Sequence, residues 1–184
     1  GGRTGSQESG PQMIMGRGQP LLMPVNPVFV WMSLLVAVLL NMVPLGRAAW
    51  APDLLMLLLV FWSVHQSTRV GMGAAFVFGL CMDVHQTALL GQHALAYTAL
   101  AYFAISFQRR LLWLSVWEQA VQVFPLFLAA HVIELVIRLL GGGVFPGWSF
   151  LVAPLLEAVL WPLASFMLLA PQRRSPDRDE NRPL

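Results

Sequence analysis

The feature that most constrains this chain is a succession of apolar runs, separated by short polar segments, that occupies most of its length. The first run, Val28–Leu45, carries no charged residue, and about 20 apolar residues suffice to cross the hydrocarbon core of a bilayer. With 57% hydrophobic and only 11% charged residues, the chain lacks the polar surface that a water-soluble globule needs. The sequence therefore predicts an all-α integral membrane protein.

The apolar runs can be read as six membrane helices. We predict transmembrane helices at approximately residues 28–45, 51–64, 70–84, 93–107, 116–140 and 148–170. Pro52 and Asp53 suit the first turn of the second helix, because this turn does not need the donor that proline lacks and a negative charge is favourable there. The glycines at 141–143 end the fifth helix, and Pro154 and Pro162 bend the sixth.

Polar segments flank this six-helix membrane domain of residues 28–171. Residues 1–12 are rich in glycine and serine and precede Met13, so we interpret them as a remnant of an expression vector. Residues 13–27 are predicted to form a cytoplasmic N-terminal lead-in, and the first apolar run to be retained as a membrane anchor. Residues 172–184 are charged and rich in proline, which predicts a disordered cytoplasmic tail.

The arginines predict the orientation in the membrane. With both termini on one side, that side receives Arg17, Arg69, Arg109, Arg110, Arg173, Arg174, Arg178 and Arg182, while the other side receives Arg47 and Arg138. Basic residues are in excess in cytoplasmic loops. We therefore predict that both termini are cytoplasmic, and we interpret the net charge of +2 as a signature of topology and not of nucleic-acid binding.

Segment 69–97 reads as two helices joined by a short polar turn, and we expect the other helices to pack around it. Small residues recur at every fourth position of its first helix, at Gly71, Ala75 and Gly79. Such a stripe shares one helix face and lets another helix backbone approach closely. Asp83 continues the stripe one turn further on. Because a carboxylate facing hydrocarbon is costly, Asp83 should point inward, towards protein or water.

Two polar pairs suggest chemistry, and each also has a simpler structural interpretation. Asp83 and His85 could begin a proton relay or a metal site, but such side chains at a helix end usually bond to the backbone, and we favour this interpretation. His131 and Glu134 have the spacing of half a carboxylate-bridged dimetal motif. Because no second half is present in the sequence, we favour an ion pair between Glu134 and Arg138, one turn later.

Other polar residues in the apolar runs give no catalytic signature. Glu118 lies near the start of its run and is expected at the membrane interface, whereas Glu157 lies inside the sixth run and is expected to face a polar interior or a partner. Cys81 is the only cysteine, so no internal disulfide can form. No serine occurs in a Gly-x-Ser-x-Gly context, and no phosphate-binding loop is present. We therefore predict no enzymatic activity and assign no catalytic, cofactor-binding or metal-binding residue.

A set of short motifs extends over nearly the whole membrane region. These motifs are Asn26-Pro27, Pro52-Asp53-Leu54-Leu55, Arg69-Val70-Gly71, Ala75-Phe76, Gly79-Leu80, Asp83-Val84, Leu90-Gly91-Gln92-His93-Ala94-Leu95-Ala96-Tyr97 and Arg109-Arg110. In this combination they resemble the rod shape-determining MreD family, which consists of inner-membrane components of the bacterial cell-elongation machinery.

The resemblance implies a function, which we state as an expectation. It implies a non-catalytic scaffold that pairs with a single-span MreC-type protein in the lipid bilayer and, through it, with MreB filaments, the RodA glycosyltransferase and its transpeptidase partner. It also implies a fold similar to the substrate-binding S-components of energy-coupling-factor transporters. The alternative is therefore a small-molecule binding or transport subunit, although the two halves of the sequence show no repeat of the kind common in transporters. No cofactor is implied.

Ten residues are the candidates for helix packing or partner contact. They are Asp53, Arg69, Gly71, Ala75, Gly79, Asp83, Gly91, His93, Glu134 and Glu157.

Overall fold

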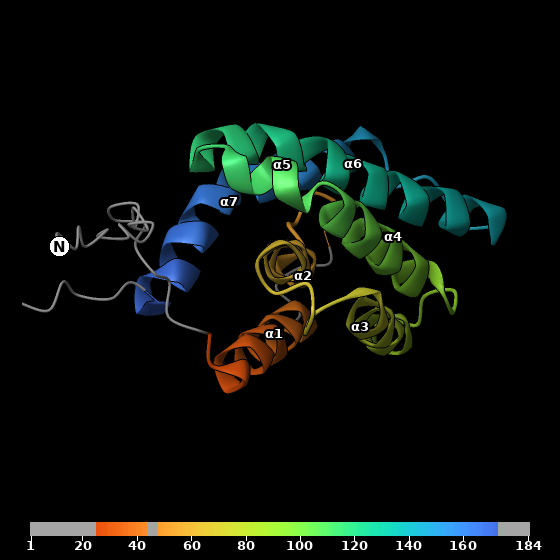
Figure 1. The fold of residues 1–184 in the computed structure, drawn as a ribbon. Coiled ribbons are helices and arrows are strands. Elements are labelled where there is room, and N and C mark those ends of the chain that lie inside the picture. Colours follow the sequence, from red (N-terminus) through yellow and green to blue (C-terminus); the bar gives the residue numbers. More distant parts are fainter. Residues whose placement is uncertain (1–24, 44–47, 173–184) are drawn as a thin grey trace, which may run out of the picture.

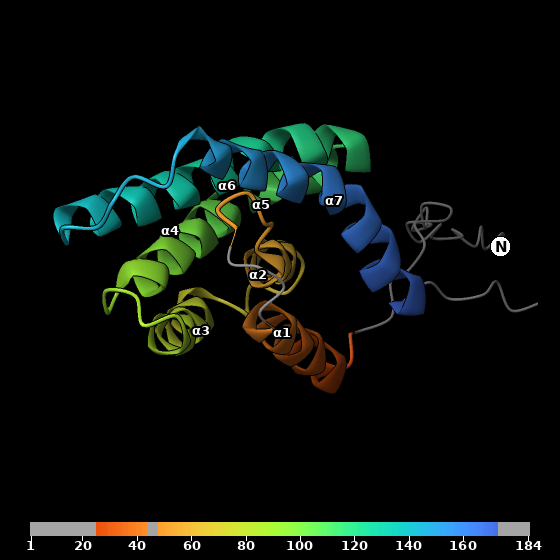
Figure 2. The ribbon, with the colours of Figure 1, turned by 180° about the vertical axis from the view of Figure 1, so that it is seen from behind.

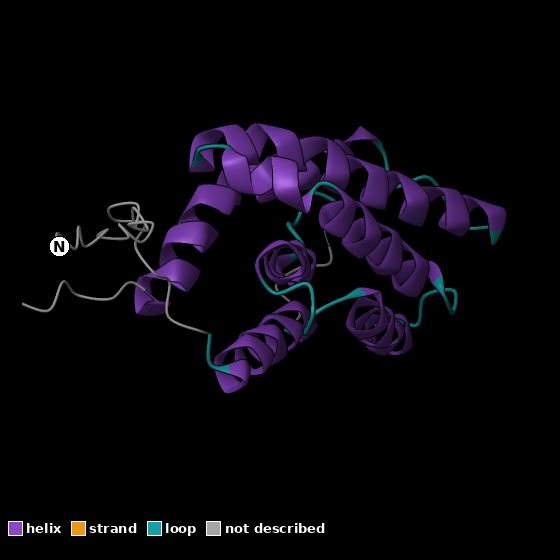
Figure 3. Ribbon diagram, viewed as in Figure 1, coloured by secondary structure: helices purple, strands orange, loops and turns teal. Residues whose placement is uncertain are grey.

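The structure is a computed structural model that describes residues 25–43 and 48–172, and within these ranges all regular structure is helical (Figure 3). The elements are α1 (Pro27–Met42), α2 (Leu54–His65), α3 (Met72–His85), α4 (Gln92–Ser106), α5 (Gln108–Trp113), α6 (Val116–Leu140), η1 (Trp148–Leu151), α7 (Val152–Leu169) and η2 (Ala170–Gln172). The predicted all-α class is confirmed. The predictions for residues 1–12, 13–24 and 173–184 lie outside the described residues.

Helix α2 is the centre of the molecule. It lies between the layer formed by α5, α6 and α7 and the layer formed by α1 and α3, and both views agree on this arrangement (Figures 1 and 2). Most of its side chains are buried, from Leu55 to Val64 apart from Leu58, and it contacts α1, α4, α5 and α7. A helix that is apolar all round is one that its neighbours enclose, so the apolar run from Leu54 to Trp62 reflects burial by protein.

Helix starts follow the capping chemistry of the sequence. Asn26 caps α1 by accepting a hydrogen bond from the N–H of Val28 at 3.0 Å. At the start of α6, the side chain of Glu118 accepts a hydrogen bond from the N–H of Ser115 at 2.9 Å, as in a capping box. Glu118 is exposed at this helix end, so its carboxylate serves the backbone and does not enter the interior.

The α3–α4 hairpin depends on one glycine. A Cβ atom added at Gly79 would lie 2.6 Å from the backbone nitrogen of Ala94 and 2.8 Å from the carbonyl carbon of His93. The two backbones therefore approach this closely only because position 79 has no side chain. At Gly71, which precedes α3, an added Cβ would lie 3.6 Å from the carbonyl oxygen of Ser67, an ordinary contact. Of these two glycines in the small-residue stripe, Gly79 is the one that allows a neighbouring backbone to come this close.

Helix α5 was not predicted. It occupies residues that the sequence analysis treated as the end of the fourth span and the loop after it. The amide of Gln108 donates a hydrogen bond to the carbonyl oxygen of Val64 at 2.7 Å, and Leu111 is buried, while Arg109 and Arg110 are exposed. These contacts attach the short helix to the C-terminal end of α2.

The described surface is largely apolar while several polar side chains are inside. Trp113 and Leu140 are 90% and 83% exposed, whereas Glu157 and Asp83 are 0% and 1% exposed. By length and composition, Val116–Leu140 and Trp148–Gln172 are apolar enough to cross a membrane, and Pro27–Met42, Leu54–His65 and Met72–His85 are shorter apolar helices. Exposed apolar surface of this extent suits contact with lipid or with other membrane helices.

Candidate functional site

Asp83, in the last turn of α3, supplies the cap that α4 lacks. Gly91, the N-cap residue of α4, has no side chain to offer, and its φ of 101° favours glycine. The carboxylate of Asp83 accepts hydrogen bonds from the N–H groups of Gly91 at 2.8 Å, His93 at 2.7 Å and Ala94 at 3.3 Å. A negative charge is favoured at a helix N-terminus by the helix dipole and by the free N–H groups. Asp83 therefore joins α3 to α4 as an anion.

Two carboxylates, those of Asp53 and Glu157, meet the N-terminus of α2. Asp53 is the N-cap residue and accepts a hydrogen bond from the N–H of Met56 at 3.0 Å, while its own N–H donates to Oε1 of Glu157 at 2.8 Å. The amide of Asn41 donates to Asp53 at 2.5 Å, and the hydroxyl of Tyr97 donates to the other carboxylate oxygen. Side chains from α1, α4 and α7 thus converge on the first turn of α2.

Two histidines and a glutamate connect these helix ends. His93 of α4 places Nδ1 2.8 Å from Asp83 and Nε2 3.9 Å from Oε1 of Glu134. His131 of α6 places Nδ1 3.6 Å from Oε2 of Glu134 and Nε2 2.9 Å from Oε1 of Glu157. Acid and imidazole therefore alternate from α3 to α7. We call Asp83, His93, Glu134, His131 and Glu157 the acid–histidine chain.

The acid–histidine chain lies at one end of the helix bundle. Helices α2 and α4 begin there and α3 ends there. The C-terminal end of α6 is beside the α3–α4 loop, because a Cβ atom added at Gly141 would lie 3.1 Å from the side chain of Leu89. The opposite end carries the exposed residues Arg69, Arg109 and Arg110. The acid–histidine chain and these exposed arginines therefore lie at opposite ends of the bundle.

The structure brings many of the candidate residues together. Asp53, Asp83, Gly91, His93, Glu134 and Glu157 lie in or directly beside the acid–histidine chain. The other candidates lie elsewhere: Ala75 and Gly79 are buried along α3, Gly71 precedes that helix, and Arg69 is exposed and donates to the carbonyl oxygen of Val25 at 3.3 Å.

Three residues of the site were absent from the candidate set. His131, Tyr97 and Asn41 each hydrogen-bond to one of its carboxylates. The signal that could have found His131 and Asn41 is their polarity within otherwise apolar runs, since polar groups in such segments usually face the interior.

The predicted ion pair between Glu134 and Arg138 is wrong. Among the described residues, the ion pairs of Glu134 are with His93 and His131. Glu134 lies on the part of α6 that packs against α4, whereas Arg138 is exposed and lies against the backbone of Gly143. Local spacing on one helix favoured the arginine, but packing between helices placed the carboxylate elsewhere.

The expectation that Asp83 bonds to backbone is confirmed by its three backbone donors, while its neighbour His85 is exposed. Within the described residues, no three histidine, cysteine, aspartate or glutamate side chains form a group that could hold a metal ion. The arrangement can therefore bind and share protons and join helices, which are the two capacities of alternating carboxylates and imidazoles.

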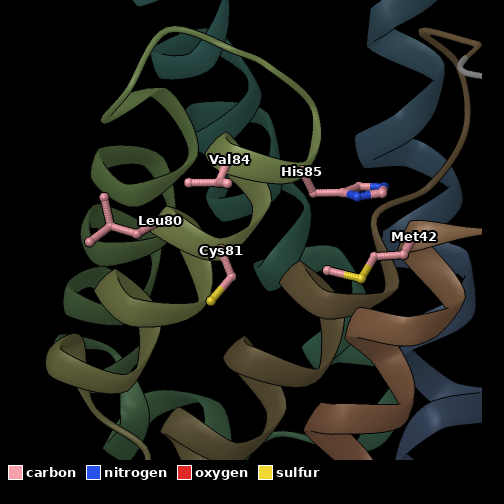
Figure 4. Close-up of a pocket in the computed structure, with 5 residues that line it drawn as sticks. All are labelled: Met42, Leu80, Cys81, Val84 and His85. Carbon is pink, nitrogen blue, oxygen red and sulfur yellow. The ribbon is translucent and has the colours of Figure 1, made fainter.

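A shallow hollow lies near the site but does not open onto it. Its volume is about 480 Å³, and it lies between the C-terminal ends of α1 and α3. The lining residues are Met42, Leu80, Cys81, Val84 and His85, and the side chains of Met42 and His85 project into the space between the two helices (Figure 4). None belongs to the acid–histidine chain. The hollow is an apolar surface feature next to α1 and not an entrance to the buried polar groups.

The all-helical fold, the largely apolar described surface and two helices long enough to cross a membrane are consistent with the class of helical membrane proteins. Within this class, the chain belongs to the MreD family of rod shape-determining proteins, because the family's profile matches residues 23–170. The rod shape-determining protein MreD of Haemophilus influenzae is 26% identical over 131 residues, which cover 71% of this chain and 80% of that protein. No solved structure matches the chain.

Family membership confirms the resemblance seen in the motifs. It implies a role in rod-shape determination, association with the cell-elongation machinery and a membrane location. Members of the family are generally non-catalytic.

Proposed function

We propose that this chain is a six-span protein of the bacterial inner membrane, with both termini cytoplasmic, that acts as a non-catalytic scaffold of the cell-elongation complex. In this role it pairs with a single-span MreC-type protein and, through it, supports the MreB filaments, the RodA glycosyltransferase and its transpeptidase partner. It thereby supports peptidoglycan synthesis and rod shape.

One observation carries the proposal beyond family membership. The carboxylates of the acid–histidine chain bond to helix N-termini and to histidines of the same molecule, whereas large apolar side chains cover the outside of α1, α6 and α7. The polar groups thus organise the interior and leave apolar helix faces for neighbours. Helices in a membrane associate through such faces by close packing, so this distribution suits a protein that holds other membrane helices.

The alternative of a small-molecule binding subunit has less support. Such a protein requires a concave site with convergent polar groups. In the hollow beside α1, His85 is the one ionisable lining residue besides Cys81, and the other three are apolar. A second hollow of about 260 Å³ is lined only by apolar side chains of α2 and α7, including Leu57, Leu160 and Met167. The acid–histidine chain lines neither hollow. Packed polar side chains of this kind favour a structural role over the capture of a solute.

Topology is the first prediction to test. Single cysteines at Thr68 and Val144, both exposed, are introduced into a Cys81→Ser background. The excess of arginine on one side predicts that position 68 is cytoplasmic and position 144 periplasmic. A membrane-impermeant thiol reagent applied to cells with a permeabilised outer membrane should label position 144 and spare position 68 until the inner membrane is opened. The reverse pattern would show that the orientation is inverted.

The scaffold function is tested in a rod-shaped bacterium depleted of its own MreD. Production of this chain should restore cell width, and purification from native membranes should recover a single-span MreC-type protein. Because a scaffold acts by assembly, variants should lose partner recovery and rod shape together. A variant that rounds the cells while it accumulates normally and recovers the partner fully would argue against a purely structural role. Recovery of ATPase subunits with a bound small molecule would support the transport alternative.

A further inference from the structure

The acid–histidine chain has a charge balance that the scaffold function leaves unexplained. Three of its five members are carboxylates, and they belong to three different helices, α3, α6 and α7. Asp83 and Glu157 are fully buried, and Glu134 is 15% exposed at its side chain. Burying carboxylates without a positive partner is costly, since each ion loses its hydration.

Among the described residues, histidine is the only source of positive charge in contact with these carboxylates. The sequence contains no lysine, and within ranges 25–43 and 48–172 each ion pair is between a histidine and a carboxylate. Arg138, one turn beyond Glu134, is exposed and forms none of them. The other titratable groups at the site, Asp53 and Tyr97, bond to each other and add no positive charge. Positive charge that balances these carboxylates therefore comes from protons on imidazole.

The geometry of the two rings leads to the same conclusion. His93 has Asp83 at 2.8 Å from Nδ1 and Glu134 at 3.9 Å from Nε2, and His131 has Glu157 at 2.9 Å from Nε2 and Glu134 at 3.6 Å from Nδ1. A neutral imidazole has one N–H group and one lone pair, so one nitrogen would direct its lone pair at a carboxylate. An imidazolium carries N–H groups on both nitrogens. Between two ionised carboxylates, only the protonated form of each ring is complementary to both of its neighbours.

Two buried carboxylate oxygens of the acid–histidine chain have no hydrogen-bond donor among the described residues. Oε2 of Glu157 and Oε1 of Glu134 are buried without a hydrogen-bond partner. With both rings protonated, three carboxylates face two positive charges, and these two oxygens are acceptors that the rings leave without a hydrogen bond. The hollow beside α1 and the hollow between α2 and α7 are lined by other residues. A proton, the smallest cation, can join these packed side chains without a cavity.

We propose that the acid–histidine chain is a proton-binding site, in which protons taken up on His93 and His131 hold the α6–α7 pair against α3 and α4. Each proton leaves a hydronium ion or a water molecule and forms an N–H bond on imidazole, so that water or hydroxide remains. Without these protons, Asp83, Glu134 and Glu157 would be close anions on three helices. Because the folded chain binds protons that the separated helices release, its stability falls when the pH is high enough to remove them.

The proposed topology adds a direction to this uptake. The acid–histidine chain lies at the end of the bundle where α2 and α4 begin and α3 ends. With both termini cytoplasmic, this end faces the periplasm, so the protons come from the periplasmic side. The direction of uptake rests on the proposed orientation. The binding of protons does not, because it follows from contacts within the chain.

The four histidines of the sequence allow a test with internal references. The full-length protein is labelled with ¹⁵N-histidine, purified into lipid nanodiscs and examined by NMR at pH 7.5. An ordinary histidine, with a pKa of about 6.5, is then about nine-tenths neutral. Burial lowers the pKa of His65, an effect larger than that of its hydrogen bond to the Phe61 carbonyl. We expect the imidazolium ¹⁵N signature for His93 and His131 and the neutral signature for His65, with single His→Gln variants providing the assignment.

A matched pair of glutamate variants tests the counter-charge. Glu134→Gln keeps the side-chain size and removes the carboxylate that both rings share, so both imidazolium signatures should be weakened or lost. Glu118→Gln changes an exposed glutamate on the same helix that bonds to the backbone of Ser115, and it should leave both signatures intact.

The proposal is overturned if His93 and His131 are neutral in the unmodified protein at pH 7.5, a result that does not depend on any variant folding. It is also overturned if a folded Glu134→Gln protein keeps both signatures at full strength. Neither measurement involves an MreC-type partner or an orientation. Loss of the scaffold function would therefore be recognised separately, by failure of partner recovery with the histidine signatures intact.

Discussion

Gly79→Leu is expected to separate α3 from α4 and to lower the free energy of unfolding by about 3 kcal/mol or more, at the upper end of what overpacking costs. The reason is geometric, because even a Cβ atom at this position would lie 2.6 Å from the backbone nitrogen of Ala94. Backbone cannot move aside as a flexible side chain can. Separation would also withdraw Asp83 from the N-terminus of α4. The hydrogen bonds that its carboxylate accepts from the N–H groups there would then be lost.

Gly73 provides the matched control for this substitution. It lies on the same helix, and an added Cβ would meet nothing within 4 Å. Gly73→Leu should change the free energy of unfolding by no more than about 0.5 kcal/mol, as is usual for exposed positions. The measurements are accumulation in the membrane and the unfolding midpoint in detergent. If the two leucine variants were equally stable, α3 and α4 could not pack through Gly79 as described.

Local sequence rules predicted helix positions better than they predicted pairs of side chains. The glycine-rich segment after Leu140 ends α6 as predicted. Asp53 was predicted in the first turn of its helix, and in the structure it is the N-cap residue directly before that turn. These features depend on neighbours a few residues away. Short-range chemistry of this kind can be read without knowing which helices touch.

Helix α5 shows where such rules stop. Its six residues are too few to form a stable helix alone, and it is held by Gln108 on the carbonyl oxygen of Val64 and by the burial of Leu111. Both contacts are with α2 or with the core around it. The sequence near position 108 contains nothing that specifies these partners, so the helix follows from tertiary packing.

The acid–histidine chain was predicted in parts but not as a unit. Asp83 and His93 are separated by one short turn, and the inward orientation of Asp83 could be argued from the cost of placing a carboxylate in lipid. The link from Glu134 to His93 spans two helices, and the link from His131 to Glu157 depends on how α7 folds back on α6. Sequence spacing instead offered Arg138 as a partner for Glu134, which is the wrong one.

Asp83→Asn is expected to be the most damaging of the conservative substitutions in the polar interior. It preserves side-chain size but replaces one carboxylate oxygen with an NH₂ group, which can only donate. In one orientation the NH₂ group would face the N–H groups of Gly91 and Ala94. In the other it would face Nδ1 of His93, which carries a proton in the proposed state. In both orientations a donor would face a donor. Removing one partner of a buried ion pair typically costs about 3–5 kcal/mol, and we expect a loss of this size.

His85→Asn is the control for Asp83→Asn, since His85 lies in the same final turn of α3 and is exposed. It should change the unfolding midpoint little. A double-mutant cycle with His93→Gln then isolates the interaction between Asp83 and His93, because these two side chains are in contact. If Asp83 is an anion paired with an imidazolium, the double variant should be less damaged than the sum of the two single changes. Strict additivity would mean that Asp83 acts on the backbone of α4 alone, and full stability of Asp83→Asn would mean that it carries no charge in the folded protein.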